Sequence, residues 1–210
     1  MDKKEQTIKR ATECYEKTQE SIIIVEATEE GFEHAARAIK ALKPLMLGLD
    51  TKTQQESSMA SVVTLAVKGG DTYIFPMKQY FDKYETMCDQ VKAVLQTVLI
   101  VKCTFDPAAR REALQGYGIN LNGCIDIRCE ARIRGFARTG VEALTTALFK
   151  TAYYRHRHKR ERRKYMQAKW EMKISSDMAE YVASRAHLTM QIYEALCALP
   201  IQPYQIETES

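Results

Sequence analysis

The sequence contains no apolar run long enough to cross a membrane. A spanning helix needs about 20 mostly apolar residues, and charged or polar residues interrupt every hydrophobic stretch before that length. The opening residues, 1–6, are mostly charged or polar and lack the apolar region of a signal peptide. We therefore expect an intracellular protein, cytoplasmic or nuclear, with no membrane partner.

The cysteines lack the spacing of a metal site or a disulfide framework. No two of them form a CxxC pair. Cys124 and Cys129 are close enough in sequence to share a zinc ion, but no histidine lies at the spacing of a zinc finger. We expect reduced, mostly buried thiols. The sequence thus predicts no metal and no cofactor.

An excess of positive charge is absent from most of the chain and concentrated in one segment. The net charge is +4, and ten basic and two acidic residues between Lys150 and Lys173 give that segment a local charge of +8. The remainder therefore carries about −4. This asymmetry indicates a localised anionic partner.

Hydrophobic periodicity predicts an α/β chain with one domain at 21–199, a charged extension at 1–20 and a tail at 200–210. Strands are expected at 22–25, 45–53, 62–67, 72–75, 98–102 and 124–127. Helices are expected at 28–42, 84–95, 107–115, 141–149, 153–170 and 177–199. This order predicts a mixed β-sheet formed early in the chain, flanked by helices, with a helical C-terminal third.

Two local patterns support the predicted sheet. Gly69 and Gly70 separate the strands 62–67 and 72–75, and glycine permits the positive φ of a tight hairpin turn. The run 45–50 is an apolar stretch that ends in Asp50, as in a buried central strand that delivers one acid to the edge of a sheet. Side chains two apart on a strand face the same way. Lys52 is therefore expected beside Asp50.

Several motifs together resemble the DEDD 3'-5' exonucleases, which include ribonuclease D, the Werner exonuclease and the proofreading domain of DNA polymerase I. The resemblance covers nearly the whole predicted domain. It rests on Asp50–Thr53 in a strand, the hairpin from Val67 to Phe75, Lys102 at a strand end, the run Leu114–Leu121, and Trp170 followed by Tyr181–Ala186. It implies a ribonuclease H-like sheet with flanking helices.

The resemblance carries over to the active site only in part. The family's first motif reads Asp-x-Glu, and this chain has Asp50 and Lys52. The second acid falls on Arg110 when counted along the motif, and the Tyr-x-x-x-Asp motif corresponds to Tyr181 and Arg185. Three metal-binding acids are therefore replaced by bases, and the implied site charge changes from about −4 to +2.

Bases in these positions oppose metal binding, because ammonium and guanidinium groups have no lone pair for Mg²⁺ and repel it. The resemblance therefore implies no metal and no hydrolysis. One interpretation is a salt-bridge cluster around Asp50 that only stabilises the fold. A second is a cationic site that binds a phosphate directly. A third is a rebuilt metal site in which Asp106, Asp126 or Asp177 supplies replacement ligands.

The basic segment is a candidate nucleic-acid interface. On a helix its charges would lie on every face, and flanking tyrosines suit stacking on bases. The alternatives are a nuclear-import signal or contact with an acidic protein. The candidate nucleic-acid-binding residues are Arg155, Arg157, Lys159, Arg160, Arg162, Arg163 and Lys164.

These inferences together predict a catalytically inactive exonuclease-like domain. It is expected to bind single-stranded RNA as an adaptor or scaffold, and it is similar in this respect to degenerate exonuclease-domain proteins of messenger-RNA localisation and small-RNA silencing. Those relatives imply protein partners in an RNA-regulatory complex and a homodimer. One alternative is a pure protein-interaction subunit without its own RNA binding. Another is a residual metal-dependent 3'-5' exonuclease.

Overall fold

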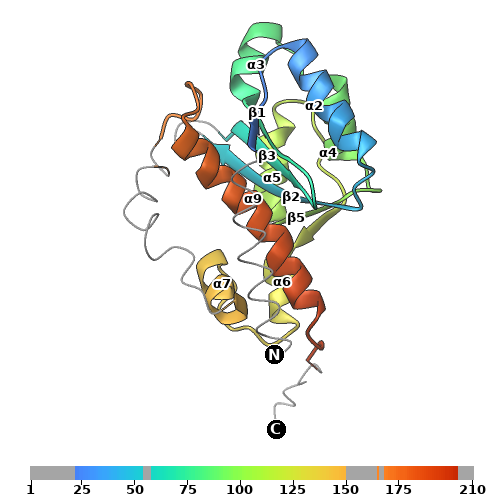
Figure 1. The fold of residues 1–210 in the computed structure, drawn as a ribbon, viewed down its shortest axis with the longest axis vertical. Coiled ribbons are helices and arrows are strands. Elements are labelled where there is room, and N and C mark those ends of the chain that lie inside the picture. Colours follow the sequence, from blue (N-terminus) through green and yellow to red (C-terminus); the bar gives the residue numbers. More distant parts are fainter. Residues whose placement is uncertain (1–21, 54–57, 150–164, 166–167, 203–210) are drawn as a thin grey trace.

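A mixed six-stranded sheet forms the centre of the protein (Figure 1). The computed structural model describes residues 22–53, 58–149, 165 and 168–202. The strands are β1 (Ile22–Ile24), β2 (Met46–Thr53), β3 (Ala60–Val67), β4 (Thr72–Phe75), β5 (Val101–Thr104) and β6 (Cys124–Asp126). Their order in the sheet is β1-β4-β3-β2-β5-β6.

Strand β2 lies at the centre of this sheet. It pairs antiparallel with β3, with Asp50 opposite Thr64, and parallel with β5. Strands β3 and β4 form the predicted antiparallel hairpin, while β1 joins β4 and β6 joins β5 in parallel. The predicted class, a mixed sheet flanked by helices, is confirmed.

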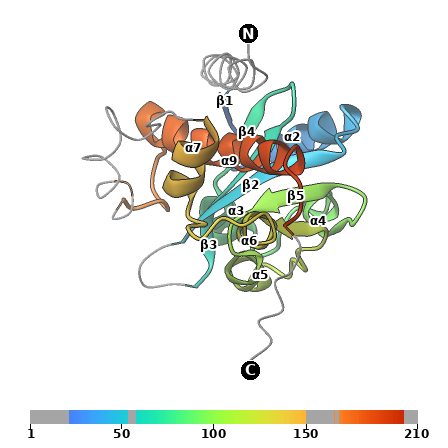
Figure 2. The ribbon, with the colours of Figure 1, turned by 90° about the horizontal axis from the view of Figure 1, so that it is seen from below.

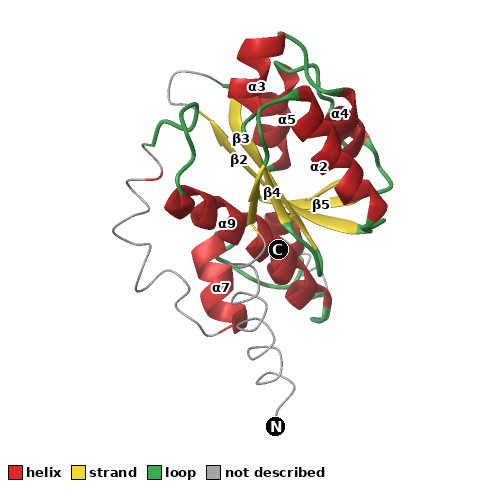
Figure 3. Ribbon diagram, turned by 45° about the horizontal axis from the view of Figure 1, so that its top comes forward, coloured by secondary structure: helices red, strands yellow, loops and turns green. Residues whose placement is uncertain are grey.

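Helices cover both faces of the sheet (Figure 3). Leu47 and Leu49 on β2 face one way, into a core shared with Phe32 and Val91. Residues Gly48 and Asp50 point to the other face, which α9 (Ser176–Cys197) crosses (Figure 2). The helices are α2 (Glu29–Ala41), α3 (Met77–Tyr84), α4 (Asp89–Gln96), α5 (Pro107–Gln115), α6 (Ile127–Arg132), α7 (Val141–Phe149) and α9 (Ser176–Cys197).

Gly48 explains how closely α9 approaches the sheet. A Cβ atom on Gly48 would lie 1.8 Å from the carbonyl oxygen of Ala186 on α9, a distance that no side chain could occupy. The helix backbone therefore rests directly on β2. This contact brings the middle of α9 beside Asp50, two residues further along the strand.

Several predicted boundaries are wrong. The helix expected at 84–95 begins only at Asp89, as α4. Helix α3, which precedes it, was not predicted and ends where Glu85 adopts a left-handed conformation with φ 60°. The strand expected at 98–102 begins only at Val101, and Val98 and Leu99 are exposed. The cap of α9 is Ser175, whose side chain accepts from the N–H of Met178, and not Ser176 or Asp177.

Other expectations are met in part. Helix α6 was not predicted, since its six residues are too few for a periodic pattern. Of the helix expected at 153–170, residues 168–170 are not helical and most of the rest lies outside the described residues. Of the cysteines in the described residues, Cys88 and Cys103 are buried, Cys124 is half-buried, and Cys129 and Cys197 are exposed.

The extension at 1–20 and most of the tail at 200–210 also lie outside the described residues, so the predicted domain limits stay predictions. Within the described part of the chain, no helix is long and apolar enough to span a membrane.

Candidate functional site

Asp50 is the centre of a buried ionic cluster. Its side chain is only 3% exposed, and three basic side chains contact its carboxylate. Lys52 Nζ lies 2.9 Å from Oδ2, Arg185 Nε donates to Oδ2 at 3.0 Å, and Arg110 Nη2 donates to Oδ1 at 3.2 Å. The structure therefore brings together the four charged residues at which the sequence places the degenerate site.

Three separate elements deliver these bases. Lys52 follows Asp50 by two positions on β2 and faces the same way. Arg110 lies in the first turns of α5, where its Nη1 also donates to the hydroxyl of Thr51 at 2.8 Å. Arg185 lies on α9, where the close approach at Gly48 brings the helix over β2. The predicted position of Arg110, which rests on spacing, agrees with this geometry.

The charges in the cluster shift each other's pKa values. Burial alone would raise the pKa of Asp50. The positive charges of Arg185, Lys52 and Arg110 lower it by more, so the pKa of this carboxyl lies well below its usual range. The pKa of Lys52 is lowered to about 8, mainly by burial. Repulsion from Arg185 and Arg110 lowers this pKa too, while attraction to Asp50 raises it. One carboxylate thus faces three bases, a net charge of about +2 near neutral pH.

Tyr181 forms the aromatic wall of the cluster. Its ring lies 4.9 Å from the ammonium of Lys52, within range of a cation–π interaction. Tyr165 stacks on the same ring at a centroid distance of 4.8 Å, and Trp170 lies at 6.4 Å. Trp170 is buried and its Nε1 donates to the carbonyl oxygen of Tyr165 at 3.0 Å, so it packs against the same aromatic group.

The donor set around Asp50 does not suit a divalent metal. Mg²⁺ requires oxygen ligands, and both oxygens of Asp50 already accept from cations. Asp106 contacts Arg128 at 3.2 Å and caps α5, while Asp126 caps α6. Across the described residues, no three His, Cys, Asp or Glu side chains form a group that could hold a metal ion.

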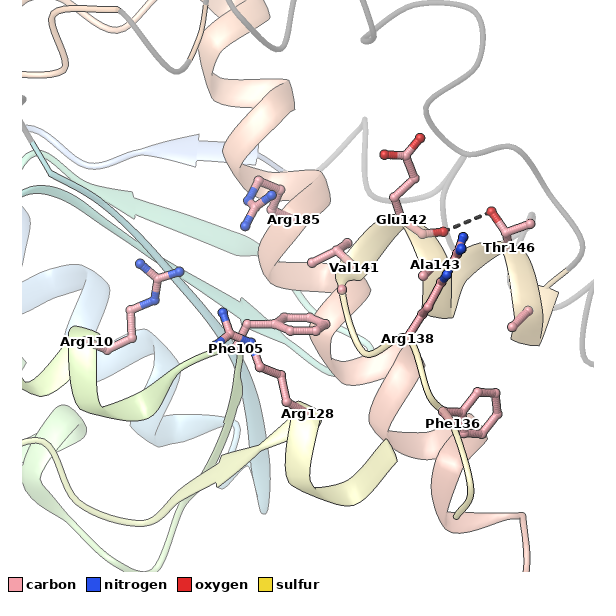
Figure 4. A pocket seen from close by; sticks show the side chains of 12 residues that line it. Phe105, Arg110, Arg128, Phe136, Arg138, Val141, Glu142, Ala143, Thr146 and Arg185 are labelled. Carbon is pink, nitrogen blue, oxygen red and sulfur yellow. Dashed lines mark hydrogen bonds between the residues drawn. The ribbon is translucent and has the colours of Figure 1, made fainter. Parts of the chain in front are cut away.

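A pocket of about 830 Å³ opens beside the cluster, and Arg110 and Arg185 belong to both (Figure 4). Arg128 and Arg138 also line it, together with Phe105 and the amino end of α7. Sequence reasoning missed these residues. The available signal was a second, weaker group of bases, with four arginines between positions 128 and 138.

The seven predicted nucleic-acid-binding residues of the basic segment, Arg155 to Lys164, lie outside the described residues. Their role stays a prediction. Tyr165, which follows them in the sequence, is buried against Tyr181. Tyr165 is the first described residue after this segment, and it lies beside the Asp50 cluster through its contact with Tyr181.

Comparisons with known proteins agree on the fold. No protein-family model matches the chain, and no curated protein matches it. Among solved structures, the chain is similar to a ribonuclease D from Trypanosoma brucei in complex with GMP, with TM-score 0.65 and 16% identity over 84% of this chain and 57% of that one. It is also similar to a protein from Bifidobacterium adolescentis, with TM-score 0.68 and 16% identity over 85% of this chain and 41% of that one.

A third similar structure is the EXD2 exonuclease domain soaked in Mg and GMP, with TM-score 0.48 and 16% identity over 84% of this chain and 89% of that one. At such identities, structural likeness establishes the fold alone. The likeness to the ribonuclease D structure therefore shows a ribonuclease H-like fold, as the sequence motifs predict.

Proposed function

We propose that this chain is a catalytically inactive exonuclease-like domain that binds single-stranded RNA as an adaptor or scaffold. The observation that carries the proposal is the neutralisation of Asp50 by Lys52, Arg110 and Arg185. Phosphodiester cleavage by two metal ions needs carboxylates that hold the two cations about 3.5–4 Å apart. Here the side chains that surround the remaining carboxylate are themselves cations.

The magnitude of the repulsion supports inactivity. Two unit charges 4 Å apart interact by about 4 kcal/mol at an effective dielectric constant of 20. A divalent ion near Asp50 would meet three such bases and one carboxylate, so the repulsion exceeds the attraction. Calorimetric titration with Mn²⁺ should therefore detect no binding at Asp50. A heat of binding that the wild type shows and the Asp50→Asn variant lacks would contradict this.

Two features support RNA as the ligand. Four arginines line the pocket beside the cluster, and the predicted basic segment adds ten bases nearby in the sequence. Phosphates that arginine and lysine bind release their counterions. For single strands, each bound phosphate should lower the logarithm of the binding constant by about 0.7 for every tenfold rise in salt concentration. We place this activity in an RNA-regulatory complex of messenger-RNA localisation or small-RNA silencing, with a homodimer as the assembly.

The test is fluorescence polarisation of a labelled single-stranded RNA at two salt concentrations. A variant in which the arginines of the basic segment become glutamate should lose affinity, and the substituted residues are Arg155, Arg157, Arg160 and Arg163. The matched control carries the same four charge reversals on exposed bases of α2, α3 and the loop after α2, namely Arg37, Lys40, Lys43 and Lys83. Equal affinity of the two variants would count against the basic segment.

A second candidate function is a protein-interaction subunit without RNA affinity. Leu45, Val98 and Leu99 favour it, because they are 83%, 69% and 82% exposed on the neighbouring loops that lead into β2 and β5. Exposed aliphatic side chains in one region often mark a protein contact. This candidate predicts a protein that copurifies with a fixed partner and leaves RNA polarisation unchanged at low salt.

A further inference from the structure

Four arginines from different parts of the chain converge on one pocket. Arg110 comes from α5, Arg128 from α6, Arg138 from the loop before α7, and Arg185 from α9. Figure 4 shows their side chains arranged around the ring of Phe105. Convergence of this kind needs three helices and a loop to meet, so the positive charge is a property of the fold and not of one sequence segment.

The acids near the pocket do not cancel this charge. Asp50 is shared between Arg110 and Arg185, and Asp106 contacts Arg128. The lining contains one carboxylate, on Glu142. In Figure 4 it points away from Arg110 and Arg128. With Lys52 included, five bases and three acids surround the pocket, an excess of about +2.

Donor groups for an anion are present in addition to charge. The Nε of Arg110 is buried and has no hydrogen-bond partner among the described residues, although its Nη1 and Nη2 contact Thr51 and Asp50. Gly140 to Ala143, at the amino end of α7, also line the pocket. The first N–H groups of a helix lack intrahelical acceptors, and they favour anions together with nearby guanidinium groups.

Apart from Glu142 and Thr146, the rest of the lining is apolar. Phe105, Phe136, Val141 and Ala143 contribute to the wall, and the volume of about 830 Å³ lies within the range of small-molecule sites. Aromatic and apolar side chains provide surfaces on which an unpaired base or a ribose can pack. The pocket therefore combines a cationic side with an apolar side, as a terminal nucleotide requires.

We propose that this pocket binds a phosphate monoester at the end of an RNA strand, which deepens the proposed RNA binding and rests on it. A monoester carries about −1.5 to −2 charges and three free oxygens at pH 7, whereas an internal diester carries one charge and two free oxygens. Several guanidinium groups in fixed positions therefore favour the monoester. The positive excess around Asp50 makes this contact directly, without a metal ion.

The experiment compares three single-stranded RNAs of one sequence in polarisation assays. One has hydroxyl groups at both ends, one has a 5'-phosphate, and one has a 3'-phosphate. One phosphorylated form should bind about tenfold more tightly than the hydroxyl form, a gain that one or two charge-assisted hydrogen bonds supply. The preferred form identifies the end that enters the pocket, and inorganic phosphate should reduce its advantage.

Arg138→Glu should abolish the preference, because Arg138 lines the pocket and is exposed, so its substitution leaves the core intact. Arg132→Glu is the matched control, since Arg132 is an exposed arginine of α6 outside the lining. A preference that survives Arg138→Glu would overturn the assignment to this pocket.

The outcomes separate this inference from the function on which it rests. Equal affinity for all three RNAs, with binding retained, would overturn the pocket proposal and leave RNA binding in place. No affinity for any of them would overturn both.

Discussion

Replacement of Asp50 by asparagine tests the ionic cluster through the sign of its effect on stability. The substitution keeps the size of the side chain but removes the one negative charge that three bases contact. In a site of clustered acids, the same change would relieve like-charge repulsion and stabilise the fold. Here it leaves three cations facing one another, so the protein should become less stable.

The structure sets the size of this loss. Asp50 is only 3% exposed, and removal of one partner from a buried ion pair typically costs about 3–5 kcal/mol because the remaining charge is uncompensated. Lys52 can limit the loss by releasing its proton, since burial already lowers its pKa to about 8. We therefore expect Asp50→Asn to lower the free energy of unfolding by about 3 kcal/mol at pH 7.

The assay is urea unfolding of both proteins across pH. The folded pKa of Asp50 lies below its ordinary value of 3.8, so its contribution is present above about pH 4 and disappears as the pH falls through the folded pKa. Asp106→Asn is the matched control, because the Asp106–Arg128 pair is about 40% exposed and should contribute less than about 1 kcal/mol. An Asp50→Asn protein as stable as the wild type would refute the reasoning.

Three further substitutions test other parts of the account. Lys52 has a pKa of about 8 in the folded protein and an ordinary pKa of 10.5, so between these pH values the unfolded chain binds more protons. The free energy of unfolding of the wild type, relative to that of Lys52→Met, should therefore rise with pH over this range by up to about 3 kcal/mol in urea titrations. Gly48→Ala should lower the stability measured by thermal unfolding by about 3 kcal/mol or more, because the new Cβ would overlap the carbonyl oxygen of Ala186. Its control is Gly140→Ala, whose Cβ would meet no atom within 4 Å and should change stability little. Burial lowers the pKa of His187 to about 4, so its imidazole should titrate near that pH in an NMR experiment, and His187→Leu should remove a rise in stability between pH 4 and 6.5. A pKa near 6.5 would show that the ring is solvated.

The central part of the fold was predictable because its signals are local. The run that ends in Asp50 forms the predicted buried strand β2, and the Gly69–Gly70 turn joins β3 to β4 as expected. The end of α3 at Tyr84 was not predictable, since Glu85 gives no sequence signal for its left-handed conformation. Val98 and Leu99 gave a false signal, because their apolar side chains indicate a buried strand although both residues are exposed and precede β5.

The site was predictable only where a motif fixes the spacing. Lys52 follows from the period of a strand, while Arg110 and Arg185 come from positions that the exonuclease resemblance supplies. Arg128 and Arg138 were missed because tertiary packing of α6 and the following loop, not sequence spacing, brings them to the pocket. The predicted order of strands along the chain could not reveal that convergence.

The most direct test of the central claim is the length of a labelled single-stranded RNA after incubation with the protein and Mn²⁺. The RNA should bind in a salt-sensitive manner and remain at full length, because the bases around Asp50 exclude the metal. Metal-dependent shortening from the 3' end that Asp50→Asn abolishes would contradict the account and establish a residual exonuclease.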